Sequence, residues 1–174
     1  MENSNYSWKT RYFSKTWNIY RNNRQVGSIE KPFFSRKSTA EINGKKYEFQ
    51  DKGFAGLESD VIDAVENKAV GKVQFDAENS IGIIQITDEK NSTLEIKNPW
   101  KNQFVLHNST GLNIAYNGSI SGLRGEIEAN KTDDLKMLSG LYLFALMSKL
   151  SNVTWLGIFA FIGIVALAVL WWVF

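Results

Sequence analysis

The chain has 174 residues, a formal net charge of +2, one histidine and no cysteine. This length suits one domain with its own core plus a membrane segment, and the near-neutral charge argues against a dedicated nucleic-acid binder. The absence of cysteine excludes disulfides, thiolate metal sites and thiol catalysis. The first residues show neither a basic region nor an apolar stretch, so no secretory signal is predicted and the domain is expected to stay in the cytoplasm.

Basic residues gather in the first 37 positions, where eight Lys or Arg stand against Glu2 and Glu30. Aromatic residues interleave with them, and two interpretations remain open. Either this is an outward face for anionic lipid or single-stranded nucleic acid, or Trp8, Phe13 and Trp17 simply point inward from alternating strands. The membrane segment described below favours anionic phospholipid headgroups over nucleic acid as the partner. The candidate lipid-facing residues are Lys9, Arg11, Lys15, Arg21 and Arg24.

Between residues 7 and 131, short alternating runs are separated by Gly, Asn, Asp and Lys, a pattern typical of an antiparallel all-β domain. Asn43-Gly44 and Asn117-Gly118 are suited to type I′ hairpin turns. The pattern predicts about a dozen strands: Trp8 to Phe13, Thr16 to Arg21, Gln25 to Glu30, Ser38 to Ile42, Lys45 to Gln50, Ser59 to Val65, Ala69 to Phe75, Ile81 to Ile86, Thr93 to Ile96, Phe104 to Asn108, Gly111 to Tyr116 and Leu123 to Glu128.

A unit of strand, polar turn and strand recurs along the chain. It contains Val26-Gly27-Ser28-Ile29 in its first copy, Val70-Gly71-Lys72-Val73 in its second, and a weaker echo at Gly125-Glu126-Ile127. A glycine repeated inside a strand indicates a bulge or a sharp bend, which a small closed barrel needs at its corners. The alternative is an ordinary β meander in which the glycines coincide by chance.

Leu135 to Leu150 is apolar on all sides and too short to span a bilayer comfortably. It is either a helix enclosed by protein or an interfacial segment that leads into the membrane. A barrel of about a dozen strands is too wide for its own side chains to fill, and this helix is the only candidate to fill it. The sequence therefore predicts, for residues 1–150, a mainly β domain: a roughly twelve-stranded antiparallel closed barrel around a central hydrophobic helix at 135–150.

Residues 155–174 form a mostly apolar run that follows the last charged residue, Lys149. About 20 residues at 1.5 Å each cross a hydrocarbon core of roughly 30 Å, whereas the alternative, a buried core helix, seldom reaches this length without a polar position. Lys131 and Lys136 also precede the run and nothing basic follows it, which predicts a single-pass membrane protein with a cytoplasmic domain. The aromatic anchors at the two ends of the span are Trp155, Trp171 and Trp172.

Together these features resemble the tubby-like superfamily, which includes tubby C-terminal domains, plant LURP-one-related proteins and phospholipid scramblases. The resemblance rests on the two Val-Gly units, on Tyr47-Glu48-Phe49 and on the closing stretch Asp133 to Leu143, and it covers about Trp8 to Leu150. It implies a twelve-stranded barrel around a hydrophobic helix that acts at membranes, in a family whose members bind phosphoinositides, move phospholipids or have no known activity. The chain departs from the family in lacking a cysteine cluster for palmitoylation and a recognisable calcium loop, and in having an extra C-terminal span. From this resemblance we therefore infer the fold of the chain and no ligand site.

No catalytic, cofactor or metal site is predicted. His107 lies in a predicted strand without a partner that the sequence connects to it, and the cluster of Glu58, Asp60 and Asp63 lacks the spacing of a calcium loop and suits a solvated strand edge. The expected function is a non-enzymatic, tail-anchored lipid-interacting or scaffolding module. The alternative is a scramblase-like phospholipid transporter, and a less favoured one is a catalytic domain that uses His107, Asp60 and Asp63. The sequence specifies no protein partner.

Overall fold

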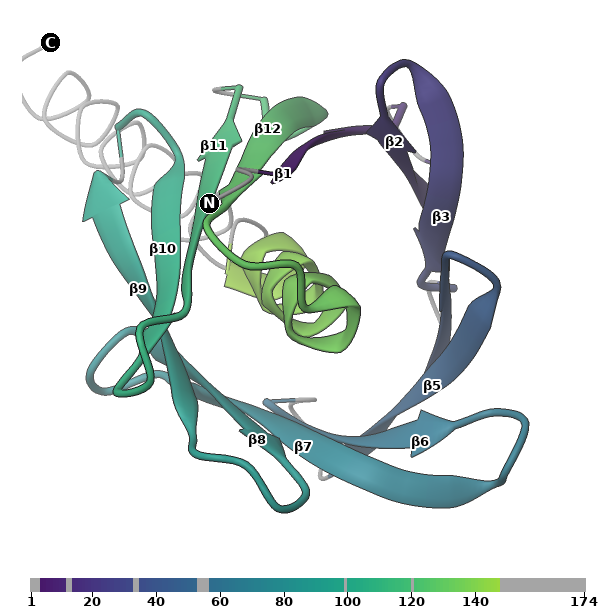
Figure 1. The fold of residues 1–174 in the computed structure, drawn as a ribbon. Coiled ribbons are helices and arrows are strands. Elements are labelled where there is room, and N and C mark those ends of the chain that lie inside the picture. Colours follow the sequence, from purple (N-terminus) through teal and green to yellow (C-terminus); the bar gives the residue numbers. More distant parts are fainter. Residues whose placement is uncertain are drawn as a thin grey trace, which may run out of the picture.

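The computed structural model describes residues 4–11, 14–32, 35–52, 57–98, 100–119 and 121–147. Within them, twelve antiparallel strands form one closed barrel in chain order, and a helix over residues 134–147 runs through its middle (Figure 1). The predicted closed barrel around a hydrophobic helix is confirmed. The strands are β1 Ser4–Lys9, β2 Thr16–Arg21, β3 Arg24–Glu30, β4 Lys37–Ile42, β5 Lys45–Lys52, β6 Glu58–Asp63, β7 Lys68–Asp76, β8 Ile81–Ile86, β9 Ser92–Asn98, β10 Gln103–Asn108, β11 Asn113–Gly118 and β12 Arg124–Ala129.

The core lies between the inner face of the sheet and the central helix. Leu138, Leu141 and Phe144 of the helix are fully buried, as are inward residues of the strands such as Ile84 and Leu94. The ring of Phe144 makes edge contacts with aromatic rings on the strands. Its ring centroid lies 5.0 Å from that of Trp8 and 4.9 Å from that of Phe104. An apolar helix fills an interior that twelve strands leave too wide for their own side chains. The enclosed placement is thus confirmed for 134–147, and residues 148–150 lie outside the described part.

The two Val-Gly repeats mark equivalent irregularities in the barrel. The pairing of β2 with β3 shifts register between Ile19 and Tyr20, opposite Gly27, and that of β6 with β7 shifts between Val61 and Ile62, opposite Gly71. A Cβ at Gly71 would lie 2.6 Å from the carbonyl oxygen of Gln85, and one at Gly27 would overlap the backbone of β4. The predicted bulges are therefore real and need glycine. The weaker third copy shows no register shift in β11–β12.

The first strand and one turn differ from the prediction. The strand predicted at Trp8 to Phe13 is observed at Ser4–Lys9, because β1 pairs with β12 from Ser4 opposite Ala129 to Lys9 opposite Arg124. Tyr6 and Trp8 alternate with polar residues and are buried, a short signal that the sequence prediction missed. Asn43-Gly44 forms the predicted hairpin turn, with positive φ at both residues. Asn117-Gly118 instead ends β11, and the connection to β12 follows at 119–123.

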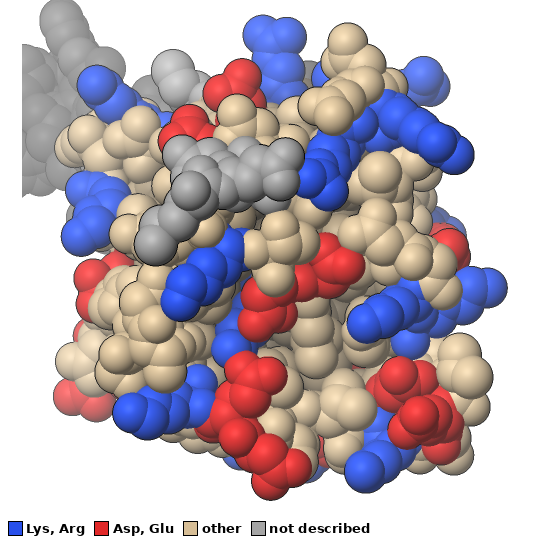
Figure 2. All heavy atoms as spheres, viewed as in Figure 1, with Lys and Arg blue, Asp and Glu red and all other residues tan. Residues whose placement is uncertain are grey.

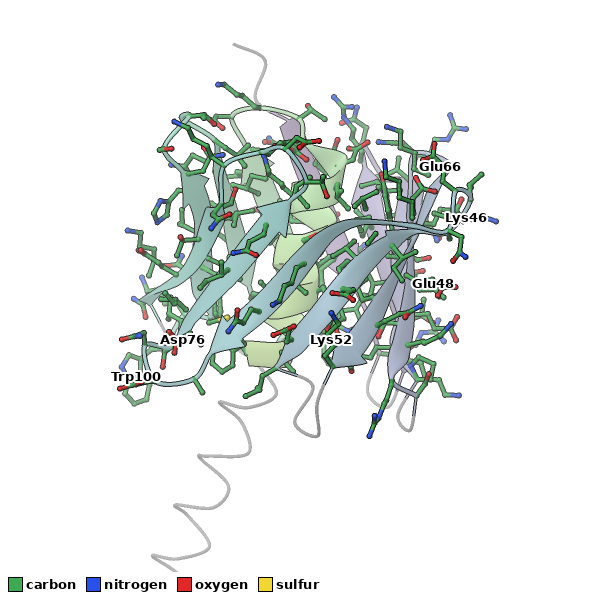
Figure 3. All side chains as sticks on the ribbon, turned by 90° about the horizontal axis from the view of Figure 1, so that it is seen from below. Lys46, Glu48, Lys52, Glu66, Asp76 and Trp100 are labelled. Atoms are coloured by element: carbon green, nitrogen blue, oxygen red, sulfur yellow. The ribbon has the colours of Figure 1, made fainter. Side chains whose placement is uncertain are left out.

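Because neighbouring strands are antiparallel, successive connections lie at alternate ends of the barrel. We call the end where the helix begins the start rim; it comprises residues 22–23, 43–44, 64–67, 87–91, 109–112 and 130–133. The opposite end, which the described part of the helix reaches at Met147, is the exit rim. It comprises the described residues of the connections β1–β2, β3–β4, β5–β6, β7–β8, β9–β10 and β11–β12. Figure 3 shows Glu66 and Lys46 near the start rim, with Asp76 and Trp100 at the opposite end.

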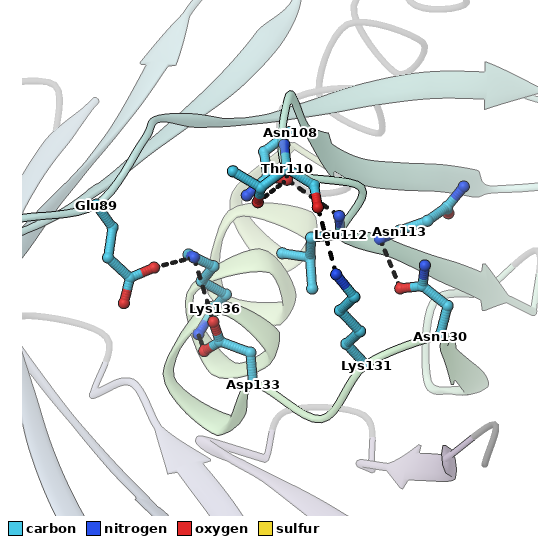
Figure 4. A network of polar contacts seen from close by, with 9 residues as sticks. All are labelled: Glu89, Asn108, Thr110, Leu112, Asn113, Asn130, Lys131, Asp133 and Lys136. Carbon is cyan, nitrogen blue, oxygen red and sulfur yellow. Dashed lines mark hydrogen bonds and ion pairs between the residues drawn. The ribbon is translucent and has the colours of Figure 1, made fainter. Parts of the chain in front are cut away.

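A polar network fastens the beginning of the helix to the start rim (Figure 4). Asp133 caps the helix, because its Oδ1 accepts the backbone N–H of Lys136 at 3.0 Å. The ammonium group of Lys136, whose side chain is 5 % exposed, pairs with Glu89 of the β8–β9 connection and with Asp133. Asn108 and Asn130 order the neighbouring loop through hydrogen bonds to its backbone. The buried cation is thus neutralised, which makes this network a structural fastening.

No helix among residues 4–147, as far as they are described, has the length and hydropathy needed to cross a membrane. The predicted span at 155–174, with its anchors Trp155, Trp171 and Trp172, lies outside the described residues.

Candidate functional site

The structure separates the five basic residues that were predicted to face lipid. Lys9, the last residue of β1, adjoins Arg11 and Lys15 at the exit rim, whereas Arg21 and Arg24 flank the β2–β3 turn at the start rim. β2 has six residues, and strands rise about 3.3 Å per residue, so the two groups lie at opposite ends of a strand roughly 20 Å long. The five residues therefore do not form one surface.

The alternation of side chains along β1 and β2 buries the aromatic rings near the N-terminus and leaves the cations exposed. Trp8 is fully buried and Trp17 packs against the core, in agreement with the predicted alternation, while Phe13 lies outside the described residues. Lys9 and Arg11 are exposed. The interpretation by alternation is thus confirmed for Trp8 and Trp17, and contact of the exposed cations with lipid stays a prediction.

Other basic residues join Arg11 and Lys15 at the exit rim. Arg36 in the β3–β4 connection and Lys101 in the β9–β10 connection are exposed, and among the described residues none of these four cations has a carboxylate within ion-pair distance. Lys52, the last residue of β5, differs, since its ammonium group lies 2.7 Å from a carboxylate oxygen of Asp60. The exit rim therefore carries charges that the described part of the chain does not neutralise.

Trp100 is the most exposed aromatic side chain of the described residues, at 74 % of its surface (Figure 3). It precedes Lys101 in the β9–β10 connection. Neither residue was singled out from the sequence, because they stand some 85 positions from the basic N-terminal stretch. The available signal was the alternation of connections in an up-and-down sheet, which brings every second connection to the same end.

Inside the exit rim, four polar side chains tie the helix to the barrel wall. The hydroxyl of Tyr142 donates to Asp51 Oδ1 at 2.5 Å, accepts from Lys31 Nζ at 2.9 Å and lies 3.1 Å from Ser59 Oγ. The ring of Tyr142 stacks on Phe49 of β5 with centroids 4.3 Å apart. Burial, and secondarily the hydrogen bond to Asp51, raises the pKa of Tyr142. We call this group the tyrosine latch. Tyr142 and Ser59 are only 2 % and 1 % exposed, whereas the side chains of Asp51 and Lys31 are 12 % and 25 % exposed.

A groove beside the exit rim contains two of the predicted cations. It has a volume of about 470 Å³ and is lined by Lys9 and Arg11 together with the hydroxyls of Thr10, Ser14 and Thr16. It lies where β1 and β2 are joined by only three register pairs. The hydroxyls of Thr10 and Ser14 already donate to the carbonyl oxygen of Thr16, so the two cations are the groups that attract phosphate or carboxylate oxygens here.

The residues considered for catalysis lie apart on the outer surface. His107 Nε2 is 3.1 Å from a carboxylate oxygen of Glu95, and both side chains are about two-fifths exposed. Asp60 pairs with Lys52, while Asp63 accepts backbone N–H groups of its own turn at 2.9 and 3.1 Å. The partner of His107 was missed because the pairing of β9 with β10 was not predicted. Within the described residues, no three His, Asp or Glu side chains are arranged to hold a metal ion.

Comparison of the chain with protein-family models, with characterised proteins and with solved structures finds no match. Its function is therefore inferred from its own residues.

Proposed function

We propose that the chain is a tail-anchored, non-enzymatic membrane protein whose barrel is a lipid-interacting or scaffolding module at the cytoplasmic face of the membrane. The observation that carries this proposal is where the chain leaves the barrel. The described part of the central helix reaches Met147 at the exit rim, whose cations Arg11, Lys15 and Lys101 pair with no described carboxylate. The apolar run begins eight positions later at Trp155. Eight steps of at most about 3.5 Å keep the exit rim within roughly 28 Å of the point where the span would enter the bilayer.

We also propose that the chain is not an enzyme. The surroundings of the candidate catalytic side chains support this. His107 is an exposed partner of Glu95 on the barrel wall, and Tyr142 of the tyrosine latch is buried. A catalytic base needs an oriented partner and a cleft that holds substrate. Membership of the tubby-like superfamily is likewise a proposal, supported by the closed barrel around a buried helix and by the two bulged Val-Gly repeats.

The orientation can be tested directly because the chain has no cysteine. Ser109 is exposed at the start rim, so Ser109→Cys in the full chain supplies a single thiol on the barrel. We expect a membrane-impermeant maleimide to label this thiol only after cells are lysed. Labelling in intact cells would place the barrel outside and reject the cytoplasmic orientation.

The alternative function, phospholipid transport, is less well supported by the interior of the barrel. The helix and the inward side chains fill it, so lipid would have to move along the outer wall. Purified full-length protein in vesicles with a fluorescent lipid tests this, using an impermeant reductant that destroys only outer-leaflet label. We expect the same protected fraction as in protein-free vesicles, and loss of that fraction would favour transport.

A further inference from the structure

We propose that the exit rim is a docking face for an anionic bilayer, on which the barrel stands end-on with Trp100 at the headgroup level. This inference rests on the proposed function, because the bilayer is the one in which residues 155–174 would anchor the chain. The rim residues assigned to headgroup phosphates are Arg11, Lys15, Arg36 and Lys101.

The connections at the two rims differ in charge. The described connections of the exit rim carry Arg11, Lys15, Lys31, Arg36 and Lys101 against Glu78. Those of the start rim carry Lys90 and Lys131 against Glu66, Asp88, Glu89 and Asp133. Figure 2, which looks onto the start rim, shows Asp and Glu side chains near the middle of that face. The connections of the exit rim therefore attract an anionic surface more strongly than those of the start rim.

Ion pairs among the described residues leave three of the exit-rim cations unneutralised. Arg11, Lys15 and Lys101 are exposed and make no ion pair with a described carboxylate, whereas Lys37 and Lys52 do. A cation that already has a partner gains little from a second anion, because the first one screens it. These exit-rim cations therefore remain available to an external anion.

Trp100 is a large apolar side chain at 74 % exposure in the same rim as these cations. Tryptophan is favoured at membrane interfaces, where its ring is shielded from water and its N–H stays hydrated. Ile96, towards the exit end of β9, adds an apolar side chain at 37 % exposure. An apolar ring flanked by basic residues matches the boundary between acyl chains and anionic headgroups.

The chain between the barrel and the predicted span is short. A link of eight steps after Met147 confines the exit rim to the neighbourhood of the bilayer. The contact then becomes intramolecular, so weak charge–headgroup interactions suffice to orient the barrel.

The test uses the full chain, reconstituted in vesicles, with one fluorophore on either rim. Ser121→Cys labels the exit rim, and Ser109→Cys is its matched control at the start rim, since both serines are exposed and the chain has no other thiol. Lipids with a nitroxide near the headgroup report contact by quenching. With phosphatidylserine present, we expect quenching at position 121 to exceed that at position 109 by about threefold or more, and the excess to shrink in pure phosphatidylcholine.

Variants with reversed charge at the exit rim provide a second test. Arg11→Glu with Lys15→Glu should remove most of the excess quenching at position 121, and so should about 1 M salt, because both weaken the attraction to anionic headgroups. The matched control is Arg21→Glu with Arg24→Glu, which makes the same change of charge at the other end of β2 and should leave the quenching unaltered. Equal effects of the two pairs would overturn the proposal.

The outcomes separate the docking face from the anchor. If the full chain does not float with the vesicles, the proposed function fails. If it floats but position 121 is as exposed to water as position 109, the docking face is wrong while the anchor stands. If position 121 is shielded only in native membranes and not in pure lipid, a protein occupies this rim and the proposal is again overturned.

Discussion

Tyr142 joins the central helix to β5 through a hydroxyl that is removed from water. We expect Tyr142→Phe to lower the free energy of unfolding by about 1.5–3 kcal/mol, because Asp51 loses a charge-assisted hydrogen bond in a buried setting. The measurement is thermal unfolding of the full chain in detergent, followed by near-UV circular dichroism. Tyr20→Phe, on a ring at the outer surface, is the control. Equal melting temperatures for the two variants would show that the tyrosine latch adds no stability.

The buried tyrosines also predict how stability depends on pH. Burial raises the pKa of Tyr116 and of Tyr142 above that of an unfolded tyrosine, which is about 10. Above pH 10 the unfolded chain releases tyrosine protons that the folded chain retains. The contribution of the two tyrosines to the free energy of unfolding is therefore fully present below pH 10 and is lost as the pH rises further. We expect the melting temperature to fall beyond pH 10, and to fall less in Tyr116→Phe with Tyr142→Phe. An unchanged slope in the double variant would contradict this assignment.

At the scale of elements, the helix fits the barrel because one of its positions lacks a side chain. A Cβ at Gly140 would collide with the ring of Tyr116, whose hydroxyl donates to the carbonyl of Met137 at 3.0 Å. Alanine is the better helix former by about 1 kcal/mol, yet we expect Gly140→Ala to destabilise the chain by about 1–3 kcal/mol through overpacking. The same unfolding measurement checks this.

The neighbouring residue provides the control for this prediction. Ser139 is fully buried and its hydroxyl has no hydrogen-bond partner among the described residues, so Ser139→Ala should be neutral or slightly stabilising. A Gly140→Ala variant that is more stable than the unchanged chain would show that helix propensity, and not the fit against Tyr116, decides at this position.

The elements were largely predictable because alternation and repeated glycines report local geometry. Gly27 and Gly71 indicated bulges before the register was known, and the all-round apolar segment required an enclosing wall. Features that depend on pairing were not predictable in this way. The start of β1 is fixed by β12, and the contact of His107 with Glu95 by the pairing of β9 with β10.

At the scale of the whole molecule, candidate residues that are close in sequence lie at opposite ends of the barrel. Arg21 and Arg24 were grouped with Lys15 although the length of β2 separates them, while Lys101 joins Lys15 at the same rim from far along the chain. Counting connections at alternate ends would have found this rim, because an antiparallel sheet in chain order leaves no other arrangement. The exit rim is therefore a property of the topology as much as of local composition.

Protein surrounds the helix at 134–147, whereas we propose that lipid surrounds residues 155–174. The most direct test is alkaline carbonate extraction of membranes that contain either the full chain or its variant with Ile164→Asp and Ala166→Asp. Each acidic residue at the centre of a span costs about 2.5–3.5 kcal/mol. We predict that the unchanged chain stays in the membrane, whereas the variant is released with its barrel folded. Retention of the variant as an integral membrane protein would mean that another segment, Leu135 to Leu150, inserts, and would contradict the barrel with a buried helix.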